Sequence, residues 1–569
     1  MPEQCKYEKG HFDYAFGSWK PFTCEEDAVE DGLCIFHHPE YWKDHKDEVR
    51  KKFMEKVEDA IRNKDSLICI GYNLPKVDLS GKAFKAPVYF KDATFYEDVN
   101  LGNTNFSVAD FTDTKFLSRA YFIGATFSSR ADFTDTKFLS RAYFIGATFS
   151  SRADFTDTKF LSRAYFNDAI FSSKVYFNRT KFSEADFVEA KFFSIAYFIG
   201  ATFSSATTFN EAKFLEGVLF DYATFLDAVS FVNSDFLPDI LEKCLKPYNC
   251  ISFRHSNFEK QEKVVFDSCN MERVSFICTD VERVKFRNVK WRNFKTYDEK
   301  LFLLKETKKE RKKFVEDGKR KLKEISKVSN ERILEVLEGK RKASETEEEI
   351  VKALESRIPD VLKEINQLEN KKEKTKDEEG RPNQLLKKCE NKINEIKSEV
   401  EEAISKKDEE IEENILENVS EDEDLTLDNV LAVYRALREN YDYYLKYDES
   451  GKFFINEMKL KKRFSNFIEK FVMSAYELLC LYGESYTRTI VWILVTIPLF
   501  ALARLLFEAS SLVLNMNSFI DSLKISTAAF FQLYYNNDWL TILERLISIS
   551  ILGSFYIALR RKLERRIRH

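Results

Sequence analysis

The sequence is poor in the residues from which most active sites are built. It has 6 histidines and 16 glycines among 569 residues. It contains no nucleophile–base motif and no glycine-rich loop of the kind that holds a phosphate group. We therefore predict that the protein is not an enzyme, and we assign it no catalytic residue.

The cysteine content and the net charge of the sequence indicate the cellular compartment of the chain and the class of partner that it binds. The 10 cysteines are scattered without a disulfide-like framework, and the opening MPEQCKYEKGHFDY has no apolar core of a secretory signal. The bulk of the chain is therefore expected to be cytosolic and reduced. The formal net charge of −5 is small for this length, so we expect no specific nucleic-acid partner.

What the sequence does have is a long internal repeat. Residues 108–129 recur at 130–151 with only the first residue changed, and again at 152–173 with changes confined to NDAI. Each repeat contains four phenylalanines at steps of 5 or 6 residues, which in the first copy are Phe111, Phe116, Phe122 and Phe127. Two residues before each phenylalanine stands Ala or Thr, so a small and a large side chain both point inward, as in a very short strand. A helix needs apolar steps of 3 and 4. One repeat of 22 residues is therefore predicted to be one four-sided coil of a solenoid.

The phenylalanine ladder covers about 84–294 and carries a family resemblance. Its motifs A-D-F-x-x-x-x-F and A-Y-F-x-x-A-x-F resemble those of pentapeptide-repeat proteins. The resemblance implies a right-handed quadrilateral β-helix, a β-solenoid, which we place at residues 76–296 with an irregular segment at 237–252. It is silent on function, because the repeated residues are structural.

A candidate metal site precedes the repeats. Cys5, Cys24, Cys34 and His37 follow the pattern C-x18-C-x9-C-x2-H, with His38 as an alternative fourth ligand. Three thiolates and an imidazole suit Zn²⁺, and a zinc ion with four protein ligands is structural rather than catalytic. The resemblance adds that similar Cys-rich starts ending in C-I-F-H precede the repeats in related proteins. The alternative is that these are small buried cysteines of a capping segment that binds no metal.

Two further elements complete the N-terminal capping segment, residues 1–75. A helix is predicted over 47–65 from the helical spacing of four apolar residues, Val49, Phe53, Val57 and Ile61. We expect it to cover the open first coil, because solenoid ends need a cap. Residues 67–75 are predicted to be a strand that leads into the solenoid.

Beyond the solenoid the chain becomes rich in Lys and Glu. Heptad-like apolar stripes run through 350–368 and 386–400 on either side of the turn signal GRPN. We predict charged coiled-coil helices over 297–424, the alternative being a flexible charged linker. Residues 425–487 return to helical spacing and are predicted to form a hairpin that resembles a tetratricopeptide-type pair and leads to the membrane.

The C-terminal region, residues 488–569, is predicted to cross a membrane twice. The spans are 489–507 and 539–559, the second of which carries Glu544 and Arg545 in its first two turns. The basic tail RRKLERRIRH marks a cytosolic flank, and the loop between the spans has almost no Lys or Arg. Both termini are therefore expected in the cytosol. The alternative is a pair of buried helices in a soluble domain.

Two features inside this region bear on function. Arg504 lies near the end of the first span and is expected to reach the interface by snorkelling. A short apolar segment, 525–538, gives the region the layout of a two-helix potassium-type pore domain, which it loosely resembles. A selectivity filter needs glycines, and QLYYNNDW contains none, so we carry over no filter residue and expect a re-entrant or interfacial helix.

These regions support three hypotheses about function. The first is a membrane-anchored cytosolic scaffold whose partners are the lipid bilayer and an unknown protein, with homo-oligomerisation left open. The second is an ion channel or pore with a cytosolic solenoid sensor. The third, ranked lower, is a DNA mimic that inhibits a topoisomerase, as some pentapeptide-repeat proteins are. Mimicry needs a strongly acidic surface, whereas the outward positions Asp132, Lys137 and Arg141 alternate in sign.

Overall fold

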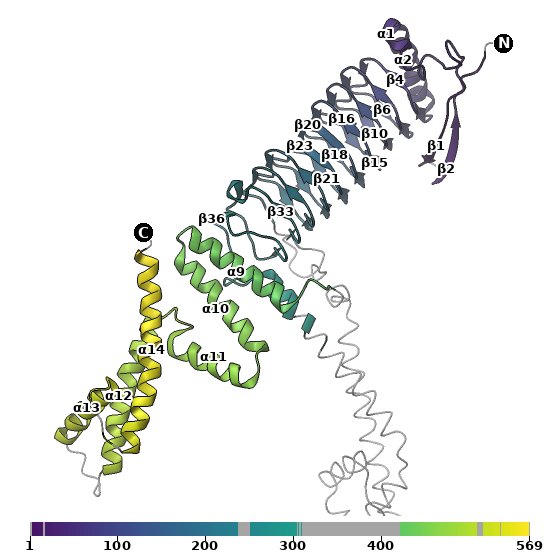
Figure 1. Cartoon of the computed structure of the whole chain (residues 1–569). Coiled ribbons are helices and arrows are strands. Elements are labelled where there is room, and N and C mark those ends of the chain that lie inside the picture. Colours follow the sequence, from purple (N-terminus) through teal and green to yellow (C-terminus); the bar gives the residue numbers. More distant parts are fainter. Residues whose placement is uncertain are drawn as a thin grey trace, which may run out of the picture. The chain divides into compact units, whose positions relative to one another are not determined.

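The structure is a computed structural model, and the residues that it describes are 3–14, 17–236, 251–303, 305–306, 309, 422–508, 516–534, 536 and 538–567. The chain divides into two compact units. The first consists of Met1–Cys244, Tyr248–Glu299 and Asp424–His569, and the second of Leu245–Pro247 and Lys300–Glu423. The coiled coil predicted for 297–424 lies almost wholly outside the described residues. The elements below belong to the first unit (Figure 1).

The centre of this unit is a parallel β-solenoid of about nine turns, which confirms the predicted fold class (Figure 1). Each turn has four sides. The first side is a ten-stranded sheet of β3 (Leu67–Ile68), β7 (Val88–Tyr89), β11 (Ala109–Asp110), β15 (Ala131–Asp132), β19 (Ala153–Asp154), β22 (Val175–Tyr176), β25 (Ala196–Tyr197), β29 (Val218–Leu219), β32 (Ile251–Ser252) and β35 (Val274–Ser275). The side that directly precedes it in each turn is a seven-stranded sheet of β6 (Ala83–Phe84), β10 (Asn105–Phe106), β14 (Thr126–Phe127), β18 (Thr148–Phe149), β21 (Ile170–Phe171), β24 (Lys191–Phe192) and β28 (Lys213–Phe214).

The other two sides form one 17-stranded sheet, because β20 (Lys159–Tyr165) and β23 (Lys181–Asp186) run round the corner between them. One side adds β4 (Asn73–Leu74), β8 (Thr94–Phe95), β12 (Lys115–Phe116), β16 (Lys137–Phe138), β26 (Thr202–Phe203), β30 (Thr224–Phe225) and β33 (Asn257–Phe258). The other adds β5 (Val77–Asp78), β9 (Val99–Asn100), β13 (Ala120–Tyr121), β17 (Ala142–Tyr143), β27 (Thr207–Thr208), β31 (Val229–Val232), β34 (Val264–Asp267) and β36 (Lys285–Arg287). A short 3-10 helix, η1 (Gln261–Lys263), precedes β34.

The phenylalanine ladder is the core, as predicted. Phe111 stacks on Phe133 with ring centroids 4.9 Å apart, and Phe133 on Phe155 at 4.7 Å, so a step of 22 residues is one turn. The small inward residue two positions before a phenylalanine also makes a hydrogen bond where it is threonine. The hydroxyl of Thr136 donates to the carbonyl of Phe111 over 2.7 Å, and threonines at the same position in neighbouring turns repeat this bond. Buried backbone carbonyls are thereby satisfied.

The solenoid's first turn is covered by the N-terminal segment. This segment contains an antiparallel hairpin of β1 (Glu8–Asp13) and β2 (Ser18–Thr23), followed by α1 (Tyr41–Asp44) and α2 (Lys46–Asn63). The predicted helix is α2, which buries Val49, Phe53 and Val57 and contacts β3 and β6. Strand β3 is itself part of the first turn. The hairpin was not predicted.

One expectation about the outward face needs correction. Asp132 alternates with inward residues as predicted, but it is 4% exposed rather than a surface charge. Its carboxylate accepts from Tyr14 Oη at 2.9 Å and from Arg130 Nη2 at 2.7 Å, because the loop after β1 lies against this side of the solenoid. Asp110 and Asp154, in the neighbouring turns, are also buried. Charge at these positions therefore cannot be counted as surface charge.

The last turn is covered by two helices that begin after the charged insertion. They are α9 (Leu427–Tyr443) and α10 (Tyr447–Phe464), the predicted hairpin. Asn440 Nδ2 donates to the carbonyls of Val281 at 2.7 Å and Val284 at 2.6 Å, and Trp291 Nε1 donates to Tyr441 Oη at 2.9 Å. The hairpin thus satisfies backbone groups at the open end of the solenoid.

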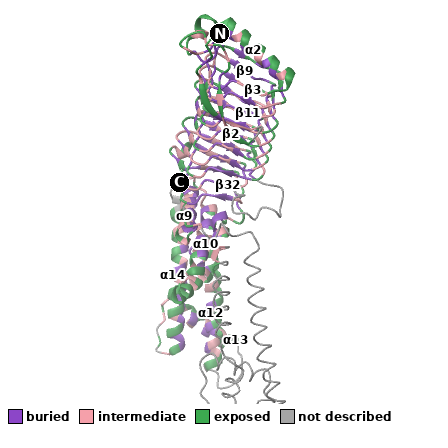
Figure 2. Cartoon of the chain, turned by 90° about the vertical axis from the view of Figure 1, so that its right-hand side faces the viewer, coloured by how far each residue is buried: buried purple, intermediate pink, exposed green. Residues whose placement is uncertain are grey.

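Four more helices follow in the described part of the chain: α11 (Phe467–Cys480), α12 (Tyr486–Glu508), α13 (Met516–Phe530) and α14 (Trp539–Ile567). Tyr486–Phe507 and Trp539–Glu564 are long and apolar enough to cross a membrane, by length and composition. Helix α13 packs on both, and it covers only the first part of the predicted segment 525–538. Much of the outer surface of α12 and α14 is exposed (Figure 2).

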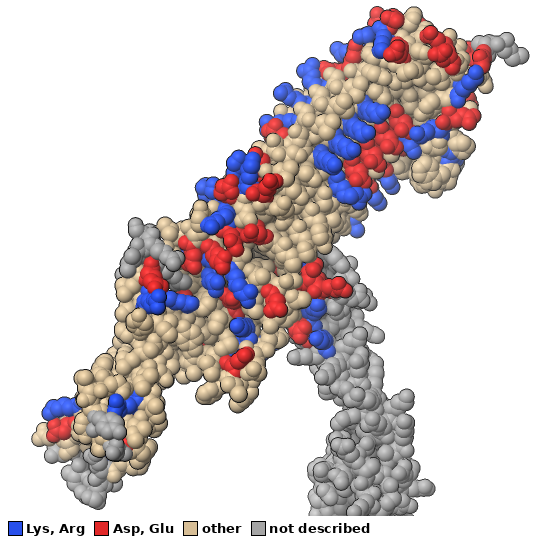
Figure 3. Space-filling view, viewed as in Figure 1, with Lys and Arg blue, Asp and Glu red and all other residues tan. Residues whose placement is uncertain are grey.

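The surface of the solenoid carries charge of both signs. On the face shown in Figure 3, Lys and Arg side chains lie beside Asp and Glu side chains along the turns. Ion pairs join neighbouring turns, such as Arg119 with Asp98 and Arg179 with Asp157, each at 2.6 Å. A face of mixed sign lacks the strongly acidic character that DNA mimicry needs.

Candidate metal centre

Four predicted ligands meet in the N-terminal segment. Cys5 precedes β1, Cys24 directly follows β2, and Cys34 and His37 share a turn before α1. Their ligand atoms all lie within 4.8 Å of one another, and all four residues are buried. The hairpin brings the two distant cysteines together, since it returns the chain from Glu8 to Thr23 beside its starting point.

The spacing of these atoms suits a tetrahedral ion. Sγ of Cys24 lies 3.8 Å from Sγ of Cys34, and Nδ1 of His37 lies 3.4 Å from Sγ of Cys5 and 3.2 Å from Sγ of Cys34. Tetrahedral bonds of about 2.3 Å hold two zinc-bound sulfur atoms about 3.8 Å apart. The cluster can therefore hold a metal ion with modest adjustment of the imidazole.

The surroundings of His37 select the tautomer that a metal needs. Its Nε2 lies 2.8 Å from the carbonyl oxygen of Ile70, which can only accept, so Nε2 carries the proton and Nδ1 has a lone pair. The ring of Tyr7 stacks on the imidazole with centroids 3.9 Å apart. Ile70 belongs to the first turn of the solenoid, so the imidazole joins the cluster to the solenoid.

The thiols differ in their acidity. The hydrogen bond from Cys24 and the neighbouring His37 lower the pKa of the Cys34 thiol, whereas that bond and burial raise the pKa of the Cys24 thiol. A buried thiolate needs a positive partner. A bound cation would supply it.

The alternative ligand, His38, lies outside the cluster. Its Nδ1 accepts from the backbone N–H of Tyr41 at 3.0 Å and of Glu40 at 3.3 Å. Its Nε2 lies 3.8 Å from Glu30 and 3.7 Å from Asp31. His38 therefore organises the turn before α1, and the sequence could not separate this role from that of its neighbour.

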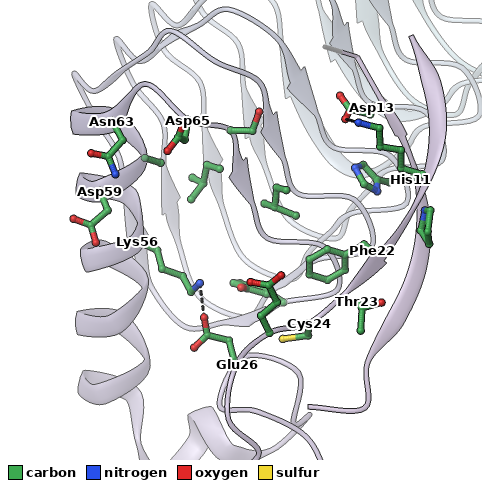
Figure 4. Close-up of a pocket in the computed structure, with 18 residues that line it drawn as sticks. His11, Asp13, Phe22, Thr23, Cys24, Glu26, Lys56, Asp59, Asn63 and Asp65 are labelled. Atoms are coloured by element: carbon green, nitrogen blue, oxygen red, sulfur yellow. Dashed lines mark ion pairs between the residues drawn. The ribbon is translucent and has the colours of Figure 1, made fainter. Parts of the chain in front are cut away.

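A hollow of about 790 Å³ lies beside the cluster, between β2, α2 and β3 (Figure 4). Cys24 forms part of its wall, and Lys56 Nζ pairs with Glu26 Oε1 across it at 2.5 Å. The ligand residues are nevertheless at most 5% exposed. Such enclosure is typical of a structural metal site.

A second polar cluster lies among the apolar C-terminal helices. Arg504 is 4% exposed, and its guanidinium donates to Glu544 Oε2 at 2.7 Å, to Thr541 Oγ1 at 3.0 Å and to Ser526 Oγ at 3.1 Å. The expectation that Arg504 snorkels outward is therefore wrong. Helix α14 brings a carboxylate to it, and inward pairing replaces contact with water.

The fold places this protein in the class of parallel β-solenoids with a phenylalanine core. Residues 111–159 and 187–235 match the family model described as Pentapeptide repeats (9 copies), and the solenoid is a pentapeptide-repeat domain. An uncharacterized protein of Methanocaldococcus jannaschii is 36% identical over 145 residues, which are 24% of this chain and 31% of that protein. The match thus spans about a third of that relative. No solved structure matches the chain.

Proposed function

We propose that this protein is a membrane-anchored scaffold whose pentapeptide-repeat solenoid binds a protein partner in the cytosol. The observation that supports membrane anchoring is the exposed apolar surface of α12 and α14. Leu494, Leu499, Leu546 and Ile549 are all more than half exposed, although they lie on helices long enough to span a bilayer. Contact with lipid removes this surface from water.

Helix α11 supports the same anchoring from the membrane surface. At about 100° per residue, its exposed apolar side chains fall on one side of the helix, namely Phe467, Ile468, Phe471, Val472 and Leu478. Glu477 lies on the other side and pairs with Lys462 of α10 at 2.5 Å. An exposed apolar face on a helix directly before a span is typical of an interfacial helix.

Charge at the end of the chain supports the orientation. The tail after the second span carries six Lys or Arg residues between Arg560 and Arg568. Basic residues that flank a span favour the cytosolic side. Two spans then return the chain to the side on which it started, so the solenoid also lies in the cytosol.

Membrane fractionation of the full chain tests the anchoring. We expect the protein to stay in the membrane pellet at alkaline pH, and the double variant Leu499→Lys, Leu546→Lys to be released. The matched control, Leu139→Lys, Leu161→Lys, places the same charges on exposed solenoid positions and should stay in the pellet. Release of the wild-type protein would overturn the proposal.

The partner surface that we propose is an apolar stripe on the solenoid. Leu139 and Leu161 occupy the same position in neighbouring turns and are 42% and 57% exposed. Contiguous exposed apolar side chains mark interaction sites on protein surfaces. A partner captured with the detergent-solubilised wild type should be lost with Leu139→Asp, Leu161→Asp, but retained with Ser150→Asp, an exposed residue elsewhere in the repeat.

The buried charges of Arg504 and Glu544 are the observation that supports the pore hypothesis. Ionisable residues inside membrane segments commonly mark ion pathways. Purified protein in liposomes distinguishes the two functions. An ion flux that Glu544→Gln abolishes supports a pore, whereas partner capture without flux supports the scaffold.

A further inference from the structure

Three ligand-type side chains from distant parts of the chain meet near the last turns of the solenoid. His255 lies between β32 and β33, Cys278 follows β35, and Asp424 precedes α9. Their ligand atoms all lie within 4.8 Å of one another, and Nε2 of His255 is 2.8 Å from Oδ2 of Asp424.

The geometry of the solenoid explains why His255 and Cys278 come together. Both occupy the same corner in successive turns, where the backbone is left-handed, with φ of 53° and 56°. The N–H of His255 donates to the carbonyl of Ile277, directly before Cys278, at 3.1 Å. Tyr222 occupies the corner one turn earlier, and its ring stacks on the imidazole with centroids 4.8 Å apart and planes 2° from parallel. The imidazole is thus held on one face by an aromatic ring.

We infer that His255, Cys278 and Asp424 bind a divalent transition-metal ion of borderline softness, such as Zn²⁺. Imidazole nitrogen, thiolate sulfur and carboxylate oxygen are all ligands of this ion. The metal would replace the proton shared by His255 and Asp424 and the proton of the Cys278 thiol. Arg254 Nη2 also approaches Asp424 Oδ2, at 3.9 Å, and competes with the metal for this carboxylate.

This site differs in kind from the N-terminal cluster. Cys278 is exposed and the other two residues are half-buried, whereas the N-terminal ligands are enclosed. Within the described residues three ligands surround the site and one of them is exposed, so an ion bound there would be accessible to solvent. The ion would therefore exchange faster than one held at the N-terminal cluster.

The position of Asp424 indicates what the metal does. Asp424 is the residue at which the chain returns to the first unit after Lys300–Glu423. Leu425 is buried, and the hydroxyl of Thr426 accepts from Asn429 N and caps α9. Binding would tie the start of the helices that cover the last turn to the solenoid.

Titration of the detergent-solubilised full chain with Co²⁺ tests this site. Thiolate-to-cobalt charge-transfer absorption reports Cys278 directly. We expect the wild type to bind one more ion than Cys278→Ser, and Asp424→Asn to weaken the additional site about tenfold or more. The matched control is Asp135→Asn, which removes a carboxylate from the same corner of an earlier turn and should leave both metal sites unchanged.

A Cys34→Ser background removes the metal site of the N-terminal cluster, so that the site at Cys278 can be measured alone. There the absorption that remains should disappear when Cys278 is also replaced. Equal stoichiometry and equal spectra for the wild type and Cys278→Ser would overturn the inference. Because Asp424 lies outside the solenoid turns, Asp424→Asn provides the same test if the cysteine variant folds poorly, and circular dichroism establishes which variants are folded.

Discussion

Arg504 Nη2 lies 2.7 Å from Glu544 Oε2, and the side chains of both residues are at most 5% exposed. They come from the two helices that, among the described residues, are long and apolar enough to span a membrane. Asp538 lies 3.5 Å from the same guanidinium. Pairing makes burial of these charges tolerable, although a buried ion pair adds little stability relative to an apolar pair of the same shape.

This relationship predicts an asymmetry between single and double replacement. Glu544→Gln leaves the Arg504 charge without its nearest partner, and we expect it to destabilise the helices by about 3 kcal/mol. The double variant Arg504→Met, Glu544→Leu removes both charges and should recover most of that loss. Thermal unfolding in detergent measures both effects. A double variant less stable than Glu544→Gln would show that the pair is itself stabilising.

The N-terminal cluster predicts stoichiometric zinc. Purified protein should contain zinc, and Cys34→Ser should lose it together with the melting step of the N-terminal segment, because metal binding is coupled to the folding of such sites. His38→Gln is the matched control, since His38 lies outside the cluster, and it should retain the metal. Elemental analysis and calorimetry measure both. A wild type without zinc, equally stable before and after chelation, would favour small buried cysteines that bind no metal.

Asp110 predicts a pH dependence of stability. Burial raises its pKa to about 6, with a smaller contribution from the Asp132 carboxylate, while hydrogen bonds from Thr112 and the charge of Lys91 oppose the shift. The folded protein therefore binds a proton that the unfolded chain has already released, and stability from this group is lost as pH rises from about 4 to about 6.

Asp110→Asn removes this loss. The amide can keep the acceptor for Thr112 N, now 2.9 Å from the carboxylate. At pH 7 the variant should be more stable than the wild type by up to about 3 kcal/mol, and near pH 4 the two should converge. Chemical denaturation at both pH values measures the difference. Equal stabilities at pH 7 would show that the carboxylate is ionised at little cost.

Periodic and local features were predictable from the sequence, and contacts between distant segments were not. The Phe111–Phe133 stack follows from a fixed step in the chain, and α2 follows from helical spacing. The hydrogen bond between Trp291 and Tyr441 joins residues 150 positions apart, and no periodic pattern in the sequence indicates it. Burial of Asp132 likewise depends on Tyr14, 118 residues earlier. Of the metal site, the ligand types and the C-x2-H step were visible, but the choice of His37 over His38 depended on the Ile70 carbonyl.

The phenylalanine core gives the most direct test of the stacked turns. Phe144 is fully buried and stacks on Phe122 and Phe166 with centroids 4.6 and 4.9 Å apart. Phe144→Ala should cost about 3 to 5 kcal/mol through lost contacts and a cavity, and Phe144→Asp should cost more because it buries an unpaired charge. Leu161→Asp is the control, since its exposed side chain should tolerate the same charge with little loss. Because each turn contacts only its neighbours, the damage should begin locally, with hydrogen exchange rising first in the turns around Phe144. If Phe144→Asp melted like Leu161→Asp, the stacked-turn core would be wrong.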